Sequence, residues 1–306
     1  MTSRNVLNTL KILFWGIVAV IAALSMLALY RGQNPFDSID FTHTNSGTLS
    51  VLHEQTLTEN ITSLNLGWNV GGITVVASND DKVHLIERAY EKVAQSKWAI
   101  VTVSGNTLKV TSGNKNAFWF FFWHTPETYL EVQLPKKTYD EFRLSVTSGN
   151  NKVTDLSVKK MDLNSTSGNL SIKNLAAESL NFNMTSGQTT FQNASMHDFD
   201  GVMTSGNMTY DGVVDQSLRL TMTSGQFSTQ LAESAPKNID FQMTSGLARF
   251  TLRAEADFTL TLSKTSGSFA ANFEHTQDGS KYTYKTGRDA YRMGMTSGSL
   301  SFDIQN

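Results

Sequence analysis

The chain has 306 residues, of which 17% are charged, with four prolines and no cysteine. Ser, Thr, Asn and Gly are abundant, which favours β-strands with polar turns over helices, and the lack of cysteine excludes disulfides and thiolate metal sites. The formal net charge is −2, and no acid lies in residues 1–30, so the remainder is more negative still and a nucleic-acid partner is disfavoured.

An uncharged segment at residues 12–30 is predicted to be a transmembrane helix. A helix of this length spans about 28 Å, close to the ~30 Å hydrocarbon core of a bilayer. Arg4 and Lys11 precede it, so the positive-inside rule makes residues 1–11 a cytoplasmic tail. We therefore expect a single-pass protein of the cell membrane, with a cytoplasmic N-terminus and an extracellular C-terminal domain.

A cleaved signal peptide is the alternative interpretation of the same segment. Signal peptides have shorter apolar cores and small residues at the cleavage site, whereas Leu27, Leu29 and Tyr30 occupy the expected position. An uncleaved anchor is the better prediction, and the lipid bilayer is its partner.

Residues 31–140 are predicted to form a divergent, β-rich cap region, which repeat arrays require at their ends. They contain strand-like runs such as Val70–Val75 and Leu130–Pro135, in which apolar and polar residues alternate or a proline ends the strand. The regular array is expected to begin near residue 141.

An aromatic loop at residues 117–124 interrupts this cap. It contains six consecutive aromatic residues, which cannot all face one side of a strand: Phe118, Trp119, Phe120, Phe121, Phe122 and Trp123. One interpretation is a plug over the open end of the core. The other is a contact with the membrane interface or with a partner's groove.

The tripeptide Thr-Ser-Gly recurs through residues 141–306. It starts at Thr147, Thr166, Thr185, Thr204, Thr223, Thr244, Thr265 and Thr296, so the intervals are 19, 19, 19, 19, 21, 21 and 31 residues. Apolar residues alternate before each motif, as in Phe182 and Met184, which is the period of a strand with one buried face. The pattern predicts an all-β fold, a single-stranded parallel β-solenoid of about 19 residues per coil, preceded by the transmembrane helix.

The motif itself is interpreted as a corner between strands, because glycine adopts the positive φ that a corner needs. The predicted structural turns are Gly149, Gly168, Gly187, Gly206, Gly225, Gly246, Gly267 and Gly298. Stacked corners would place like hydroxyl groups above one another, in ladders comparable to those of Asn or Gln.

No pattern in the sequence indicates catalysis. The six histidines are scattered and do not follow the repeat, so the serines lack a general base, and no cofactor or metal site is expected. The residues just after the glycines are uncharged: Asn150, Asn169, Gln188, Asn207, Gln226, Leu247 and Ser268. This column could hydrogen-bond a sugar but could not supply the acid and base of a polysaccharide-acting β-helix enzyme.

The last interval is unusually long, and Glu274–Ala290 is polar with an Asp278-Gly279 turn, which predicts a small hairpin. The strand at Leu300–Ile304 would then be the open edge of the solenoid. Such an edge makes self-association possible.

The transmembrane start, the two cap strands and the Thr-Ser-Gly coils together resemble a bacterial family of putative adhesins of unknown function with β-strand repeats, which includes the LiaG-like proteins of cell-envelope stress operons. The resemblance implies a binding or scaffold role at the cell envelope, in stress response or sensing, with surface adhesion as the alternative. It supplies no catalytic residue. The partners expected are a protein of the envelope, a cell-wall polymer or a cationic peptide.

Overall fold

The structure, a computed structural model, describes residues 48–113, 126–231 and 234–305. The predicted tail, transmembrane helix and aromatic loop, Phe118 to Trp123 included, lie outside the described residues. Within them, no helix has the length and apolar character needed to cross a bilayer. The division into a cap of residues 31–140 and an array of residues 141–306 stays a prediction.

The described residues form strands and one short 3₁₀ helix, η1 (Gln95–Lys97). The strands before the regular coils are β1 (Ser50–Leu57), β2 (Ser63–Trp68), β3 (Gly71–Ala77), β4 (Val83–Ala89), β5 (Ile100–Ser104), β6 (Thr107–Thr111), β7 (Thr128–Leu134) and β8 (Thr138–Val146). The long strands of the coils are β9 (Asn150–Ser165), β10 (Asn169–Met184), β11 (Gln188–Met203) and β12 (Asn207–Met222).

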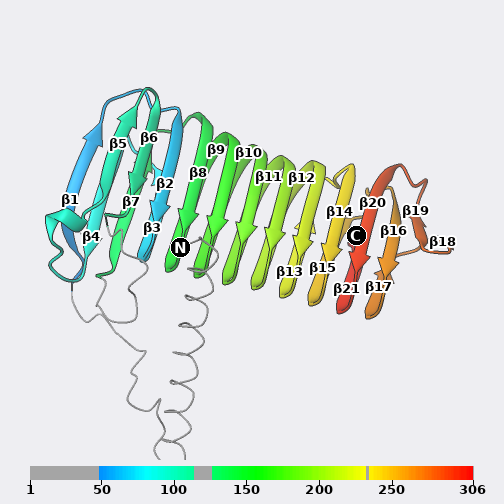
Figure 1. The fold of residues 1–306 in the computed structure, drawn as a ribbon. Coiled ribbons are helices and arrows are strands. Elements are labelled where there is room, and N and C mark those ends of the chain that lie inside the picture. Colours follow the sequence, from blue (N-terminus) through cyan, green and yellow to red (C-terminus); the bar gives the residue numbers. More distant parts are fainter. Residues whose placement is uncertain (1–47, 114–125, 232–233, 306) are drawn as a thin grey trace, which may run out of the picture. The chain divides into compact units, whose positions relative to one another are not determined.

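The remaining strands are shorter. They are β13 (Gln226–Leu231), β14 (Asn238–Met243), β15 (Leu247–Arg253), β16 (Phe258–Lys264), β17 (Ser268–Asn272), β18 (Thr276–Asp278), β19 (Lys281–Tyr284), β20 (Asp289–Met295) and β21 (Ser299–Gln305). Successive coils pair in parallel, so the β-domain is a row of stacked coils (Figure 1). The prediction of an all-β, solenoid-like fold is confirmed.

The four coils of β9 to β12 each bend a second time, six residues after the glycine of the corner. Asp155, Asn174 and Asn193 have φ between +52° and +57°, and Gly212 takes the equivalent place in the next coil. Asn and Asp tolerate this left-handed conformation better than other side chains, which explains their use here. The long strands β9 to β12 therefore turn within themselves, and each supplies two sides of a coil.

Parallel stacking places equivalent residues in rows through the core. A methionine row lies just before the corners and is 0–4% exposed: Met184, Met203, Met222, Met243 and Met295. Further rows are aromatic, with Phe191 and Tyr210 5.5 Å apart and Phe250 and Phe302 also 5.5 Å apart between ring centroids. Burial of these rows is the main stabilising term of the solenoid.

The coil order departs from the sequence order at the N-terminal end of the domain. Strands β2 and β3 form a coil that lies between the β6/β7 coil and the β8/β9 coil. The chain therefore forms the inner coil of β2 and β3 first, then the outer coil of β6 and β7, and then crosses back to β8 on the other side of the inner coil. Strands β1, β4 and β5 add antiparallel neighbours at the outer edge.

The C-terminal end shows the same departure. Strands β20 and β21 lie between the β14/β15 coil and the β16/β17 coil. The 31-residue interval arises because the chain builds the outer coil first, forms the β18–β19 hairpin against β16, and then returns. The expectation that Leu300–Ile304 is an open edge is thus wrong, since β21 is paired on both sides, and β17 lies at that edge.

Candidate functional site

The Thr-Ser-Gly corners stack directly on one another. All eight predicted turn glycines have φ between +88° and +120°, and a Cβ at any of them would overlap backbone atoms of a stacked glycine, as Gly187 would overlap Gly168. The threonine, serine and post-glycine N–H groups donate to the neighbouring coil, at about 2.9 Å in most coils. The corner row thus permits no side chain at the glycine.

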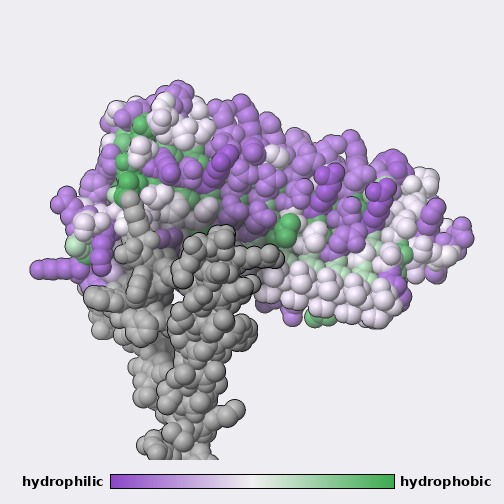
Figure 2. All heavy atoms as spheres, viewed as in Figure 1, coloured by the Kyte–Doolittle hydropathy of each residue, from purple (hydrophilic) through white to green (hydrophobic). Residues whose placement is uncertain are grey.

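The corner serines do not form the expected hydroxyl ladder. Seven donate instead to the carbonyl of the threonine one coil away, for example from Ser167 Oγ to Thr147 O at 2.8 Å and from Ser266 Oγ to Thr296 O at 2.9 Å, and Ser148 donates to the carbonyl of Asn69 at 2.9 Å. A carbonyl oxygen is the nearer acceptor because the close stacking of the glycines places the backbone of one coil beside the serine side chain of the next. The serines are therefore structural, and the stacked corners form a pale band of intermediate hydropathy along the lower edge of the coils (Figure 2).

The strand segment after each corner carries the uncharged column predicted from the sequence. In space the column runs Asn150, Asn169, Gln188, Asn207, Gln226, Leu247, Ser299 and Ser268. Ser299 stands between Leu247 and Ser268 because β21 is inserted between β15 and β17. The sequence order could not show this neighbour.

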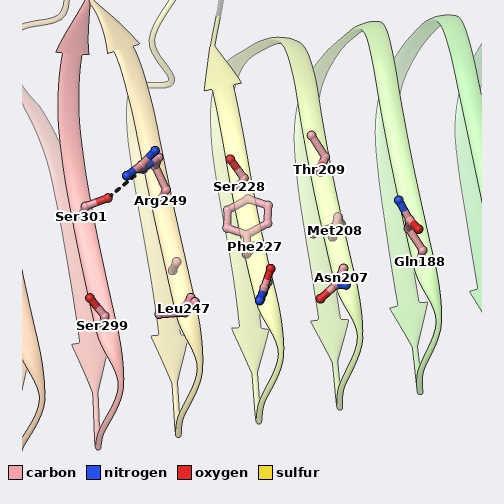
Figure 3. A pocket seen from close by; sticks show the side chains of 12 residues that line it. Gln188, Asn207, Met208, Thr209, Phe227, Ser228, Leu247, Arg249, Ser299 and Ser301 are labelled. Carbon is pink, nitrogen blue, oxygen red and sulfur yellow. Dashed lines mark hydrogen bonds between the residues drawn. The ribbon is translucent and has the colours of Figure 1, made fainter.

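A groove of about 560 Å³ lies over the middle of this column. Two rows of side chains border it, one at the first position after the corner and one two residues further on (Figure 3). The residues that line it are Gln188, Asn207, Met208, Thr209, Gln226, Phe227, Ser228, Leu247, Ala248, Arg249, Ser299 and Ser301. Among the lining residues Arg249 alone carries a charge.

Three pairs of stacked amides in the described part of the chain bond to one another. Asn169 donates to Asn150 at 2.9 Å, Asn193 to Asn174 at 2.8 Å and Asn183 to Asn164 at 3.2 Å. The side-chain amides of Gln188, Asn207 and Gln226, in the groove, have no such partner among the described residues. The groove therefore presents donors and acceptors that the protein itself does not satisfy.

One group of residues outside the groove has the connectivity of a catalytic relay. Thr56 Oγ1 lies 3.0 Å from His84 Nδ1, and His84 Nε2 lies 2.9 Å from Asp80 Oδ1. The bond to His84 is the main reason that the pKa of Asp80 falls to about 2. Thr56 is exposed on the open surface of β1, so nothing encloses a reacting group there. We interpret the chain of bonds as a tie between β1 and the turn before β4.

The sequence did not indicate this relay because Thr56 lies 28 residues before His84 and all three residues are outside the repeat. No group of three or more His, Asp or Glu side chains suited to a metal ion occurs in the described ranges. The positive charge of Arg249 in the groove was also missed, since only the first column after the glycines was considered.

The sequence matches the Toastrack DUF4097 family over residues 61–302, from β2 to β21. The chain belongs to this family. No curated protein matches it. The recognised resemblance to adhesin-like proteins of unknown function is thereby confirmed.

Several solved structures are similar to this Toastrack chain. A putative adhesin from Bacteroides fragilis has 14% identity and a TM-score of 0.45, covering 84% of this chain and 98% of that one. A putative lipid binding protein from Parabacteroides distasonis has 11% identity and a TM-score of 0.34, covering 85% and 98%. Neither similarity supports a statement about the ligand of this chain.

Proposed function

We propose that this Toastrack protein is a binding or scaffold module of the bacterial cell envelope, held to the membrane by residues 12–30 and exposed outside the cell. The observation that carries the proposal is the groove, in which unpartnered amides stand on a rigid backbone array. A preorganised surface loses little conformational entropy on binding, which suits recognition. A role in envelope-stress response or sensing follows from the family resemblance, and surface adhesion is the alternative.

Catalysis is the weaker interpretation of the same surface. General acid–base chemistry on a polysaccharide needs paired carboxyl groups over the ligand, and the residues that line the groove include no carboxyl group. The expected partners remain a protein of the envelope, a cell-wall polymer or a cationic peptide. The groove's single charge is positive, so a cationic peptide is the least suited of these to bind there.

The experiment uses the full-length chain with a C-terminal tag, expressed in a bacterial host. External protease added to cells without a wall should remove the tag, while a cytoplasmic control protein stays intact. Mild crosslinking of intact cells, followed by purification through the tag, should recover a specific protein or polymer. A protected tag would contradict the topology, and recovery of nothing beyond the chain itself would contradict the binding role.

A further inference from the structure

The groove side chains differ from the other stacked amides of the protein in one simple respect. Long and short amides alternate in this part of the column, at Gln188, Asn207 and Gln226, whereas the bonded amide pairs, Asn150–Asn169 in the same column and Asn164–Asn183, join side chains of equal length. Glutamine places its amide one methylene further from the backbone than asparagine does. Neighbouring amides therefore stand at different heights, and none reaches its neighbour in the bonded geometry of a ladder.

Hydroxyl groups extend this unpartnered surface along the second row. Thr209 and Ser228 line the groove beside the amides, and their hydroxyls have no hydrogen-bond partner in the described part of the chain. Coils stack about 4.8 Å apart, so polar groups recur at that interval along the solenoid axis. A ligand that uses several of them must be extended, run across the strands and offer many hydroxyl or carbonyl groups.

Arg249 adds a charged end to these rows. Its Nε contacts Ser301 Oγ at 3.3 Å and Asp303 Oδ2 at 3.5 Å, while its two terminal nitrogens have no hydrogen-bond partner among the described residues. The side chain is 67% exposed, so the contact with Asp303 is worth little and is readily exchanged. The free terminal nitrogens have the geometry that binds a carboxylate, phosphate or sulfate through two hydrogen bonds.

We propose that the groove binds an extended anionic polysaccharide, with sugar hydroxyls on the Gln188–Asn207–Gln226 row and an acid group on Arg249. This deepens the proposed binding role and rests on it. A neutral glycan would leave the guanidinium unused, and a compact ligand would reach only one or two coils. The acid group is a carboxylate of a uronic acid or a phosphodiester, since both present paired oxygens.

The test measures binding to the full-length chain in mild detergent by calorimetry. The probes are an oligogalacturonate, the same oligomer as its methyl ester, and a sugar-phosphate polymer in which phosphodiesters join the sugar units. The ester keeps the sugar chain and removes only the charge. The unmodified chain should bind an anionic probe at least about tenfold more tightly than the ester, as expected for a charge-assisted hydrogen bond. Whether the uronate or the phosphate polymer binds identifies the source of the acid group.

Arg249→Gln should bind the anionic probe only as tightly as the ester. The matched control is Arg219→Gln, because Arg219 is 65% exposed, pairs with Asp200 at 3.9 Å and stands on a different side of the coil. This control removes the same charge and should bind as the unmodified chain does. Gln226→Leu should weaken the acid and the ester forms alike, by several-fold, since it removes a neutral hydrogen-bond partner.

Equal losses in Arg249→Gln and Arg219→Gln would show attraction by net charge alone and would overturn the proposal. Unchanged binding in Arg249→Gln would overturn it too, as would failure of every probe to bind. If no probe binds while crosslinking in cells captures a protein partner, the binding role stands and only the glycan inference fails. If both experiments are negative, both fail.

Discussion

Each Thr-Ser-Gly corner restricts its glycine in two independent ways. The backbone conformation has positive φ, and the neighbouring coil fills the space that a side chain would need. Gly279, in the β18–β19 turn, meets only the first restriction, with φ of +57° and open space around it. A comparison of the two positions therefore separates conformational strain from steric overlap.

Gly187→Ala should lower the free energy of unfolding by more than about 2 kcal/mol, because strain and overlap act together. Gly279→Ala should cost about 1 kcal/mol, from strain alone. Thermal or denaturant unfolding of both variants measures the difference. Equal effects would mean that the stacked corner relaxes around the new methyl group.

Glu87 makes stability depend on pH. This residue is 1% exposed, and its Oε1 has no hydrogen-bond partner within residues 48–113, 126–231 and 234–305, while Oε2 accepts from the N–H of Ala99 at 2.7 Å. Burial raises its pKa, against the opposing effects of Ala99, Thr128 and His53. The folded state therefore holds this proton more tightly than the unfolded state, and the associated stability is complete below the unfolded pKa of about 4.3 and is lost as pH rises through the folded pKa.

Glu87→Gln should abolish this decline in unfolding free energy with rising pH, as measured by denaturant titrations across pH 4 to 8 (roughly the range where such a group titrates). Glu131→Gln is the control of opposite sign. Its carboxylate accepts from Gln133 and Arg88, which lowers its pKa, so its contribution is present above the unfolded pKa and lost as pH falls through the folded one. Equal pH profiles for Glu87→Gln and the unmodified chain would contradict the assignment.

At the scale of one coil, the second bend combines a conformation with a ladder. Asn174 has φ of +54°, donates to Asp155 at 2.6 Å and accepts from Asn193 at 2.8 Å. Asn181, seven residues later, donates to Asp162 at 2.8 Å and has an ordinary φ. Replacing Asn181 therefore removes one hydrogen bond between stacked side chains and leaves no strained φ behind.

Asn174→Ala should therefore destabilise by about 2–3 kcal/mol, the sum of two lost ladder bonds, to Asp155 and from Asn193, and a strained φ. Asn174→Gly should recover the conformational part, and Asn181→Ala should cost about 0.5–1 kcal/mol, the ladder bond alone. Urea unfolding of the three variants gives the comparison. A glycine variant no more stable than the alanine variant would show that φ is unimportant at this bend.

The repeat unit could be predicted from the sequence because every coil repeats the same local chemistry. The glycine corners and the alternation around Met184 occur within a few residues of each other, and local conformational preference determines them. Hydrogen bonding between coils could not be predicted so well. The corner serines donate to carbonyl groups of the neighbouring coil and not to its hydroxyl groups, which depends on small differences in atomic position. Arg249 lines the groove because its row and the uncharged column lie on the same face of the coils.

The order of coils is a property of the whole molecule, and no local pattern encodes it. The strands β16 and β20 are similar in length and alternation, so the sequence alone does not say which of them stacks on β14. The long interval before the last corner predicted an inserted hairpin, but it did not indicate that β20 and β21 stack between β14/β15 and β16/β17. Only long-range packing, together with the hairpin against β16, decides it.

Cysteine pairs test the coil order, since the chain has no cysteine of its own. Leu247→Cys with Ser299→Cys should form a disulfide under mild oxidation, because register partners on neighbouring strands are about 4.8 Å apart. Leu247→Cys with Ser268→Cys should not, because one coil separates them and their distance is about 9.6 Å. Mass spectrometry after digestion identifies the bond, and the reverse result would restore the sequence order.

The exchanged coils at the C-terminal end also affect how the chain is built on the ribosome. Residues 258–272 emerge before residues 289–305, so this coil exists for a time without the neighbour on which it finally stacks. Its β16 strand can meanwhile pair with the β18–β19 hairpin, which is local in sequence. The hairpin thus occupies one edge of a nascent strand that would otherwise be open to wrong pairing. Assembly from one end to the other cannot then be the folding route, because β20 and β21 are made after the outer coil and enter the row at a position inside it.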